Sequence, residues 1–257
     1  MKRIVVKVGS AVLTDNNNNI AKERMLNLVT LLAKLRKKYD VILVSSGAVA
    51  AGYSALKPDK TKQIGRKAIA AAGQPILMSS YKRKFDIFGI DTAQILLTED
   101  DFDSRKRTKM FQEIIDMHLD NDIVPIVNEN DISSTPEQLF GDNDQLSANV
   151  AYRTDADLLV ILSDIDGYYD KNPKEFSDAK VIKHISELPE GVLNDEHSAN
   201  NEFATGGIVT KLIAADYLMK RGRNTFLTNG FDLSAMESFL LKNEHTLGTL
   251  FKPKKQQ

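Results

Sequence analysis

The sequence predicts an α/β protein, a three-layer αβα sandwich around a mainly parallel central sheet. Short runs rich in Val and Ile alternate with longer segments of helical periodicity, which is the rhythm of a parallel sheet covered by helices on both faces. The first two runs are joined by residues 21–38, whose apolar side chains recur at helical spacing at Met25, Leu28, Val29, Leu32 and Leu35. Strand, helix and strand in this order form a βαβ unit.

The remaining elements follow from the same two periodicities. We expect strands at residues 3–8, 40–45, 91–97, 123–127, 157–163 and 224–228. We expect helices at residues 21–38, 47–56, 61–87, 104–120, 142–153 and 207–221, the last ended by a C-cap at Gly222. Turn residues interrupt the pattern between Ile132 and Gly141, which predicts a projecting hairpin or lid, and residues 165–205 are expected to be irregular.

Length and composition exclude several classes of protein. A chain of 257 residues can form one large α/β domain or two small ones. The absence of cysteine excludes disulfides, thiol catalysis and cysteine-ligated zinc, and is consistent with a cytoplasmic location. A net charge of -1 gives no overall attraction to nucleic acid or membrane, and no apolar stretch is long enough for a signal peptide or a membrane span. The four histidines lack metal-ligand spacing, so we expect them to be structural or exposed.

Two lysines stand beside small residues, at the end of a predicted strand and at the start of a predicted helix. Lys7 is followed by Val8-Gly9-Ser10, and Lys211 closes a segment that begins Thr205-Gly206-Gly207. Each segment combines a mobile lysine ammonium group with backbone N–H groups that can bind an anion. These groups together are suited to binding a polyphosphate. A solvated strand-end lysine is the alternative for Lys7. Neither the P-loop motif nor the dinucleotide-binding glycine motif occurs, so the phosphate site is of another type.

Two other predicted strands end in small polar residues. Ser45-Ser46-Gly47 leads one strand directly into a helix, so a ligand can approach the helix N-terminus closely. An ordinary turn with a serine N-cap is the alternative. Ser163-Asp164 follows a fully apolar strand, and if Asp164 faces both lysines it would hold their ammonium groups in place; an Asx turn is the alternative.

Carboxylates and amides gather on either side of the predicted lid. Asn128-Glu129-Asn130-Asp131 precedes it, and Gly141-Asp142-Asn143-Asp144 follows it. Acidic side chains can hold an ammonium and amides can hold a carboxylate, so the two clusters suit the head of a free amino acid. A polar surface loop is the alternative.

Taken in order, these motifs resemble the glutamate 5-kinases, a family within the amino acid kinase superfamily. The similarity extends from residue 3 to about residue 251, with small departures at Ser163 and Ile208, where Thr and Met are common. The lysine and glycine motifs imply the amino acid kinase fold. The sequence Asn-Glu-Asn-Asp followed by Gly-Asp-Asn-Asp implies glutamate as the substrate.

The resemblance implies an activity and a domain organisation. The activity is ATP-dependent phosphorylation of the L-glutamate γ-carboxylate to L-glutamyl 5-phosphate, the first step of proline biosynthesis, with ATP and Mg²⁺ as cofactors and L-proline as feedback inhibitor. We expect a homo-oligomer in the cytoplasm. Residues 1–257 would form a single amino acid kinase domain, with a glutamate-binding part at about 1–150, a nucleotide-binding part at about 151–251 and no C-terminal PUA domain.

Carried over by position, the resemblance also assigns roles to individual residues. Catalysis would depend on Lys7, Lys211 and Asp164. Glutamate would contact Ser46, Gly47, Asp131 and Asn143. ATP would contact Lys7, Gly9, Ser163, Asp164, Thr205, Gly206, Gly207 and Lys211. The sequence does not indicate which groups hold the metal ion.

Three other functions are less well supported by the pattern. A sibling kinase would act on acetylglutamate, aspartate, carbamate or a nucleoside monophosphate, but Asp131 favours a substrate with a free α-ammonium. A catalytically silent amino-acid sensor would have no use for two lysines. Nucleic-acid binding lacks both a basic face and a stacking motif.

Overall fold

The computed structural model describes residues 2–15, 19–56, 63–133, 143–189, 191–193 and 207–254. At its centre lies one eight-stranded sheet with the order β3-β4-β2-β1-β5-β7-β8-β6. Neighbouring strands pair in parallel except β7 and β8, which are antiparallel. The strands are β1 (Lys2–Val8), β2 (Tyr39–Ser45), β3 (Thr92–Leu97), β4 (Val124–Glu129), β5 (Leu158–Ser163), β6 (His184–Ile185), β7 (Asn224–Asn229) and β8 (Thr249–Phe251).

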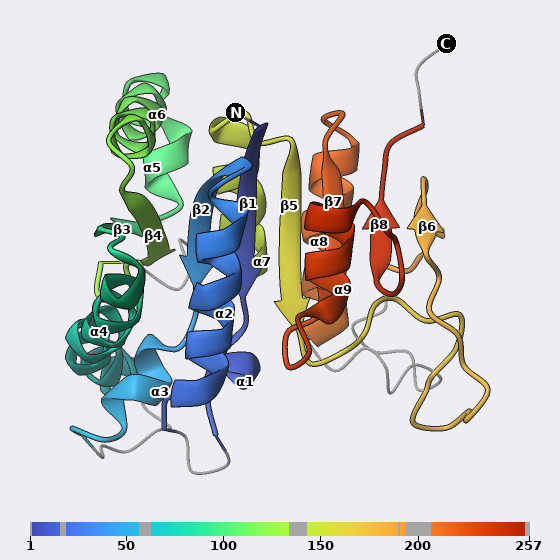
Figure 1. Ribbon diagram of the computed structural model, residues 1–257, viewed down its shortest axis with the longest axis horizontal. Coiled ribbons are helices and arrows are strands. Elements are labelled where there is room, and N and C mark those ends of the chain that lie inside the picture. Colours follow the sequence, from blue (N-terminus) through green and yellow to red (C-terminus); the bar gives the residue numbers. More distant parts are fainter. Residues whose placement is uncertain are drawn as a thin grey trace.

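Helices cover both faces of this sheet, so the predicted three-layer αβα sandwich is confirmed (Figure 1). The longer helices are α2 (Lys22–Leu35), α4 (Gln63–Phe85), α6 (Arg105–Asp120), α7 (Asn143–Arg153) and α8 (Gly207–Met219). The shorter ones are α1 (Ser10–Leu13), α3 (Ala48–Gly52), η1 (Asp86–Phe88), α5 (Asp100–Asp103), α9 (Ser234–Glu237) and η4 (Ser238–Lys242).

Two apolar cores lie on opposite faces of the sheet because successive side chains of a strand point to opposite sides. In β1, Ile4, Val6 and Val8 join the core beneath α2 and α4. Val5 joins the other core, beneath α6, α7 and α8. Lys7 follows the same alternation, so its side chain starts out toward α7 and α8.

The six predicted strands are confirmed to within two residues at each end. Sequence patterning missed β6 and β8, which have two and three residues and depend on pairing between distant segments. The predicted strand 123–127 extends to Glu129, and the predicted helix 47–56 ends at Gly52. Gly222 has the expected left-handed conformation (φ 74°) after α8. The predicted lid falls mostly on residues 134–142, outside the described residues.

Helices α3 and α4 cross with their main chains in contact, at two glycines. A Cβ atom at Gly52 would lie 2.0 Å from the carbonyl oxygen of Ile69, and one at Gly73 would lie 1.8 Å from that of Ala48. Real Cβ atoms essentially never come within 3.0 Å of such an atom, so the crossing requires glycine at both positions. This contact sets the strand-to-helix turn after β2 against the N-terminal half of α4.

None of the helices in the described ranges is both long and apolar enough to cross a lipid bilayer.

Candidate active site

A cleft of about 310 Å³ lies at the C-terminal ends of β1, β2, β4 and β5. This is the edge of a parallel sheet where α/β proteins bind ligands. Its walls include the expected residues Lys7, Gly9, Ser46, Gly47, Asp131, Asn143, Ser163, Asp164 and Lys211. The fold therefore brings together side chains that lie up to about two hundred positions apart in the sequence.

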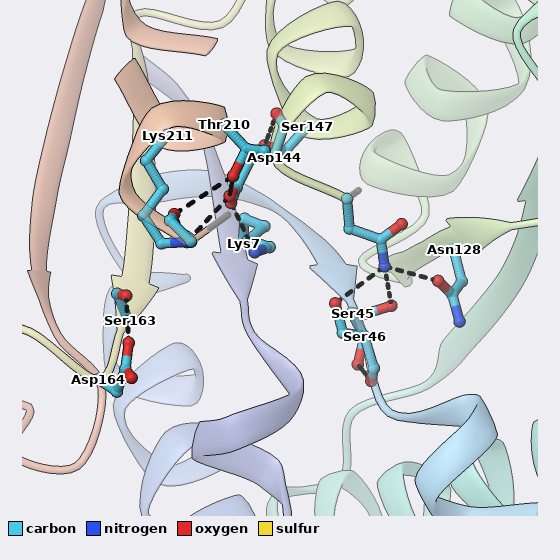
Figure 2. Close-up of polar contacts among 12 residues, drawn as sticks. Lys7, Ser45, Ser46, Asn128, Asp144, Ser147, Ser163, Asp164, Thr210 and Lys211 are labelled. Carbon is cyan, nitrogen blue, oxygen red and sulfur yellow. Dashed lines mark hydrogen bonds and ion pairs between the residues drawn. The ribbon is translucent and has the colours of Figure 1, made fainter. Parts of the chain in front are cut away.

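Both lysines bind one carboxylate, that of Asp144 (Figure 2). Lys7 Nζ lies 2.5 Å from Asp144 Oδ1, and Lys211 Nζ lies 3.1 Å from Asp144 Oδ2. The Asp144 side chain is fully buried, and the lysine side chains are 5% and 11% exposed. The two ammonium groups thus form a fixed pair at one end of the cleft, held by a shared counter-ion.

Local structure explains why these three residues meet. The alternation of β1 points Lys7 toward the side on which α7 and α8 lie, and Asp144 is the second residue of α7. Lys211 is in the first turns of α8, where its ammonium also donates to the carbonyl of Gly207 (2.6 Å). Thr210 Oγ1 donates to Asp144 Oδ2 at 3.0 Å. The starts of two helices thus converge on the end of β1.

The expectation that Asp164 would hold both lysines is wrong. Its carboxylate accepts a hydrogen bond from Ser163 Oγ (2.9 Å), and it forms no ion pair with either lysine, all three residues being described. Continuing the alternation of β5, Asp164 lies on the side of Leu162, away from α7 and α8. Asp164 is exposed at the cleft, where a role in nucleotide binding stays a prediction.

The opposite part of the cleft is organised by the amide group of Asn143. Its Nδ2 lies within hydrogen-bonding distance of Asn128 Oδ1 (2.9 Å), Ser46 Oγ (3.0 Å) and the carbonyl of Ser45 (3.1 Å). The Asn143 side chain thereby joins the start of α7 to the ends of β2 and β4. The hydroxyl of Ser45 is in turn hydrogen-bonded to the buried hydroxyl of Tyr81 (2.8 Å).

Asp131 follows β4 and lines the same cleft. Burial raises the pKa of its carboxyl group, and the positive charges of Arg66 and Lys67 oppose that rise. A partly desolvated carboxylate gains more from an incoming cation than an exposed one does. The site can therefore accept an ammonium group at Asp131.

The two expected glycines of the strand ends have different surroundings. Gly47 has φ 105°, a conformation that other residues rarely adopt, and it lets β2 turn directly into α3. Gly9 lines the cleft, but its amide already donates to the carbonyl of Leu162 (3.2 Å), so this N–H is not free for a phosphate. Gly207 opens α8, whereas Thr205 and Gly206 lie outside the described residues.

Comparisons with known proteins identify the family. The sequence model of the amino acid kinase family matches residues 2–229. The chain is 53% identical to a glutamate 5-kinase of Wolinella succinogenes over 256 residues, which is 98% of each chain. It is 49% identical to a glutamate 5-kinase of Leishmania donovani, over 98% of this chain and 95% of that one. The chain belongs to the amino acid kinase family, among its glutamate 5-kinases.

Solved structures that share the fold of this glutamate 5-kinase family member include two kinases with other substrates in their titles. An isopentenyl phosphate kinase of T. acidophilum superimposes with a TM-score of 0.67 at 17% identity, over 98% of this chain and 100% of that one. A UMP kinase of Ureaplasma parvum gives a TM-score of 0.67 at 18% identity, over 98% of both chains. At such low identity these likenesses confirm the expected amino acid kinase fold and carry no information on the substrate.

Sequence reasoning missed two residues at the site of this family member, one buried beneath the cleft and one in its wall. Asp144 closes the segment Gly141-Asp142-Asn143-Asp144, and its place in the first turn of a predicted helix was the signal that could have indicated its contact with the lysines. Arg66 lines the cleft from the first turn of α4, and no motif marked it. Among the described residues, no group of three or more His, Asp or Glu side chains is arranged to hold a metal ion.

Proposed function

We propose that this protein transfers the γ-phosphoryl group of ATP to the γ-carboxylate of L-glutamate, giving L-glutamyl 5-phosphate in the first step of proline biosynthesis. One observation carries the proposal: two ammonium groups share a buried carboxylate in a cleft that also contains Asp131. Identities of 47–53% to proteins named glutamate 5-kinase support the choice of substrate. We also propose that the protein catalyses this reaction in the cytoplasm.

Transfer of a phosphoryl group to a carboxylate requires positive charge at the transition state and does not require a general base. A glutamate side chain has a reference pKa of about 4.3, so its carboxylate is already a nucleophile at neutral pH. The obstacle is the approach of this anion to a polyanionic phosphate chain, and each preorganised donor at the transition state is worth about 3 kcal/mol. Lys7 and Lys211 would supply these donors, and Asp144, as a positioning residue, would fix their separation before substrates arrive.

The nucleotide would lie toward the end of β5. Ser163 and Asp164 line the cleft there, and Gly207 begins the helix that carries Lys211. Thr205 and Gly206 complete the proposed set from outside the described residues. Asp164 would be the carboxylate available to an Mg²⁺ ion, which would offset negative charge of the phosphate chain when bound. The described residues contain no cluster of three or more His, Asp or Glu side chains, which fits an ion held mainly by phosphate and water.

Glutamate would lie toward the ends of β2 and β4. Asp131 would receive its α-ammonium, and Ser46 and Asn143, whose side chains are hydrogen-bonded to each other at 3.0 Å, would also contact the substrate. Gly47 would let the substrate approach the backbone closely. This assigns acceptor binding to residues of about 1–150 and nucleotide binding to about 151–251. Inhibition by L-proline and assembly into a homo-oligomer stay predictions.

Trapping with hydroxylamine tests the proposal directly, because an acyl phosphate is captured as a hydroxamate. The protein is incubated with MgATP and L-glutamate, N-acetyl-L-glutamate or L-aspartate, and ATP consumption is followed in parallel. Hydroxamate formed with L-glutamate alone is the expected result. Product with only one of the other acceptors would reassign the substrate, and glutamate binding without ATP consumption would indicate a sensor. The Lys211→Ala variant is the control for contaminating kinases.

A further inference from the structure

Arg66 lines the cleft, and the phosphoryl-transfer mechanism proposed above assigns it no role. It stands in the first turn of α4 and lines the same cleft as Asp131. Its charge is close enough to lower the pKa of Asp131 against the effect of burial. The Arg66 side chain is exposed in the wall of the cleft. Within the part of the chain that the structure describes, its guanidinium group has no hydrogen bond or ion pair.

Among the described residues, the charged side chains beside Arg66 in the lining of the cleft are carboxylates, and the neighbouring Lys67 is not part of the lining. Asp131 and Glu129 line this part of the cleft, whereas the two ammonium groups of the site lie with Asp144. Lys67, the next residue of α4, donates to the carbonyl of Ile132 at 3.2 Å. Of the three described cations in the lining of the cleft, Lys7 and Lys211 are paired with Asp144, which leaves Arg66 to face a ligand.

We propose that Arg66 binds the α-carboxylate of the amino acid acceptor while Asp131 binds its α-ammonium. A free α-amino acid carries both groups on one carbon, so an acid and a guanidinium facing one cleft match its head. A planar guanidinium pairs with a carboxylate through two parallel hydrogen bonds, which also fixes orientation. The inference rests on the proposed function, because it takes glutamate as the acceptor.

This arrangement answers a question of regiochemistry. Glutamate has two carboxylates, and both are attracted by the lysine pair at the other end of the cleft. A cation beside Asp131 holds the α-carboxylate away from that pair, so the γ-carboxylate alone reaches the phosphate. Arg66 would thus determine both which class of acceptor binds, free α-amino acids with a terminal carboxylate, and which of its carboxylates reacts.

A substrate comparison separates this role from simple neutralisation of Asp131. L-Glutamate is compared with L-isoglutamine, which keeps the γ-carboxylate and has an α-amide in place of the α-carboxylate. In Arg66→Gln we expect KM for glutamate to rise about 10- to 100-fold, the range of one charged hydrogen-bonded contact, while KM for isoglutamine changes less than about twofold. The kcat for glutamate should change little, and Arg66→Lys should keep part of the selectivity.

The control is Arg83→Gln, which removes the same charge from the other end of α4 at an exposed position. It should leave both KM values unchanged. Equal losses for the two substrates in Arg66→Gln, or no loss for either, would overturn the role of Arg66 while leaving the proposed function intact. If the wild-type protein makes hydroxamate with neither substrate and binds neither by calorimetry, the proposed function and this inference both fail.

Discussion

Replacing Asp144 by Asn should damage both stability and turnover, because it removes the common counter-ion of two buried ammonium groups. Its side chain is fully buried, and the lysine side chains are 5% and 11% exposed, so solvent screens these contacts little. Two charge-assisted contacts at about 1.5–3 kcal/mol each give about 3–6 kcal/mol, close to the 3–5 kcal/mol typical of a broken buried pair. For a chain of this size the loss corresponds to a fall in Tm of about 6–24 °C.

The matched control for this change is Asp164→Asn. Asp164 is exposed and, among the described residues, contacts neither lysine, so the free energy of unfolding should change by less than about 0.5 kcal/mol. Urea unfolding at neutral pH without ligands measures both variants. In the hydroxamate assay, Asp144→Asn should lower kcat by about 10²–10³-fold with a smaller change in the KM for glutamate. Equal destabilisation by the two variants, or a loss below about 1 kcal/mol for Asp144→Asn, would refute the reasoning.

Three further results are expected. Lys211→Ala should lower kcat more than it raises KM for glutamate, whereas Asp131→Ala should chiefly raise that KM; interchanged effects in steady-state kinetics would contradict the assignment. Tyr81→Phe removes the buried hydrogen bond to Ser45 Oγ (2.8 Å) and should cost about 1 kcal/mol in urea unfolding, with an unchanged midpoint as the contrary outcome. Burial lowers the pKa of His245, so its folded-state pKa lies below the unfolded value of about 6.5. The free energy of unfolding is therefore highest above pH 6.5 and falls as the pH drops below that value. In Tm measurements from pH 5 to 8, His245→Phe should make this fall smaller.

Periodicity predicted most of the fold because the longer elements repeat their apolar residues regularly. The alternation of β1 and the helical spacing of α2 are visible without any structure. The two-residue strand β6 has no such signal, since it exists only through its pairing with β8. In this chain, strands of six or seven residues were predicted from the sequence, whereas strands of two or three residues were not.

The candidate site was predicted as a set of residues, but not as a set of contacts. Spacing placed Lys7 and Lys211 at the same edge of the sheet, and the cleft contains both. The sequence could not decide whether Asp144 or Asp164 would lie between them, because that depends on which side of β5 a residue just beyond the strand faces. Arg66 was not found because a basic residue near the start of a predicted helix, followed by Lys67, is the ordinary pattern of a solvated helix end.

The glycine crossing of α3 and α4 links the two walls of the proposed acceptor pocket. One wall is the turn with Ser46 and Gly47, just before α3, and the other carries Arg66, one turn before the main-chain contact of Gly52 with Ile69. Because no side chain separates the two main chains at this crossing, a shift of one helix requires a shift of the other. The width available to an acceptor's carbon skeleton is therefore set by main-chain geometry, and a methyl group added at either glycine would resize the pocket from a distance.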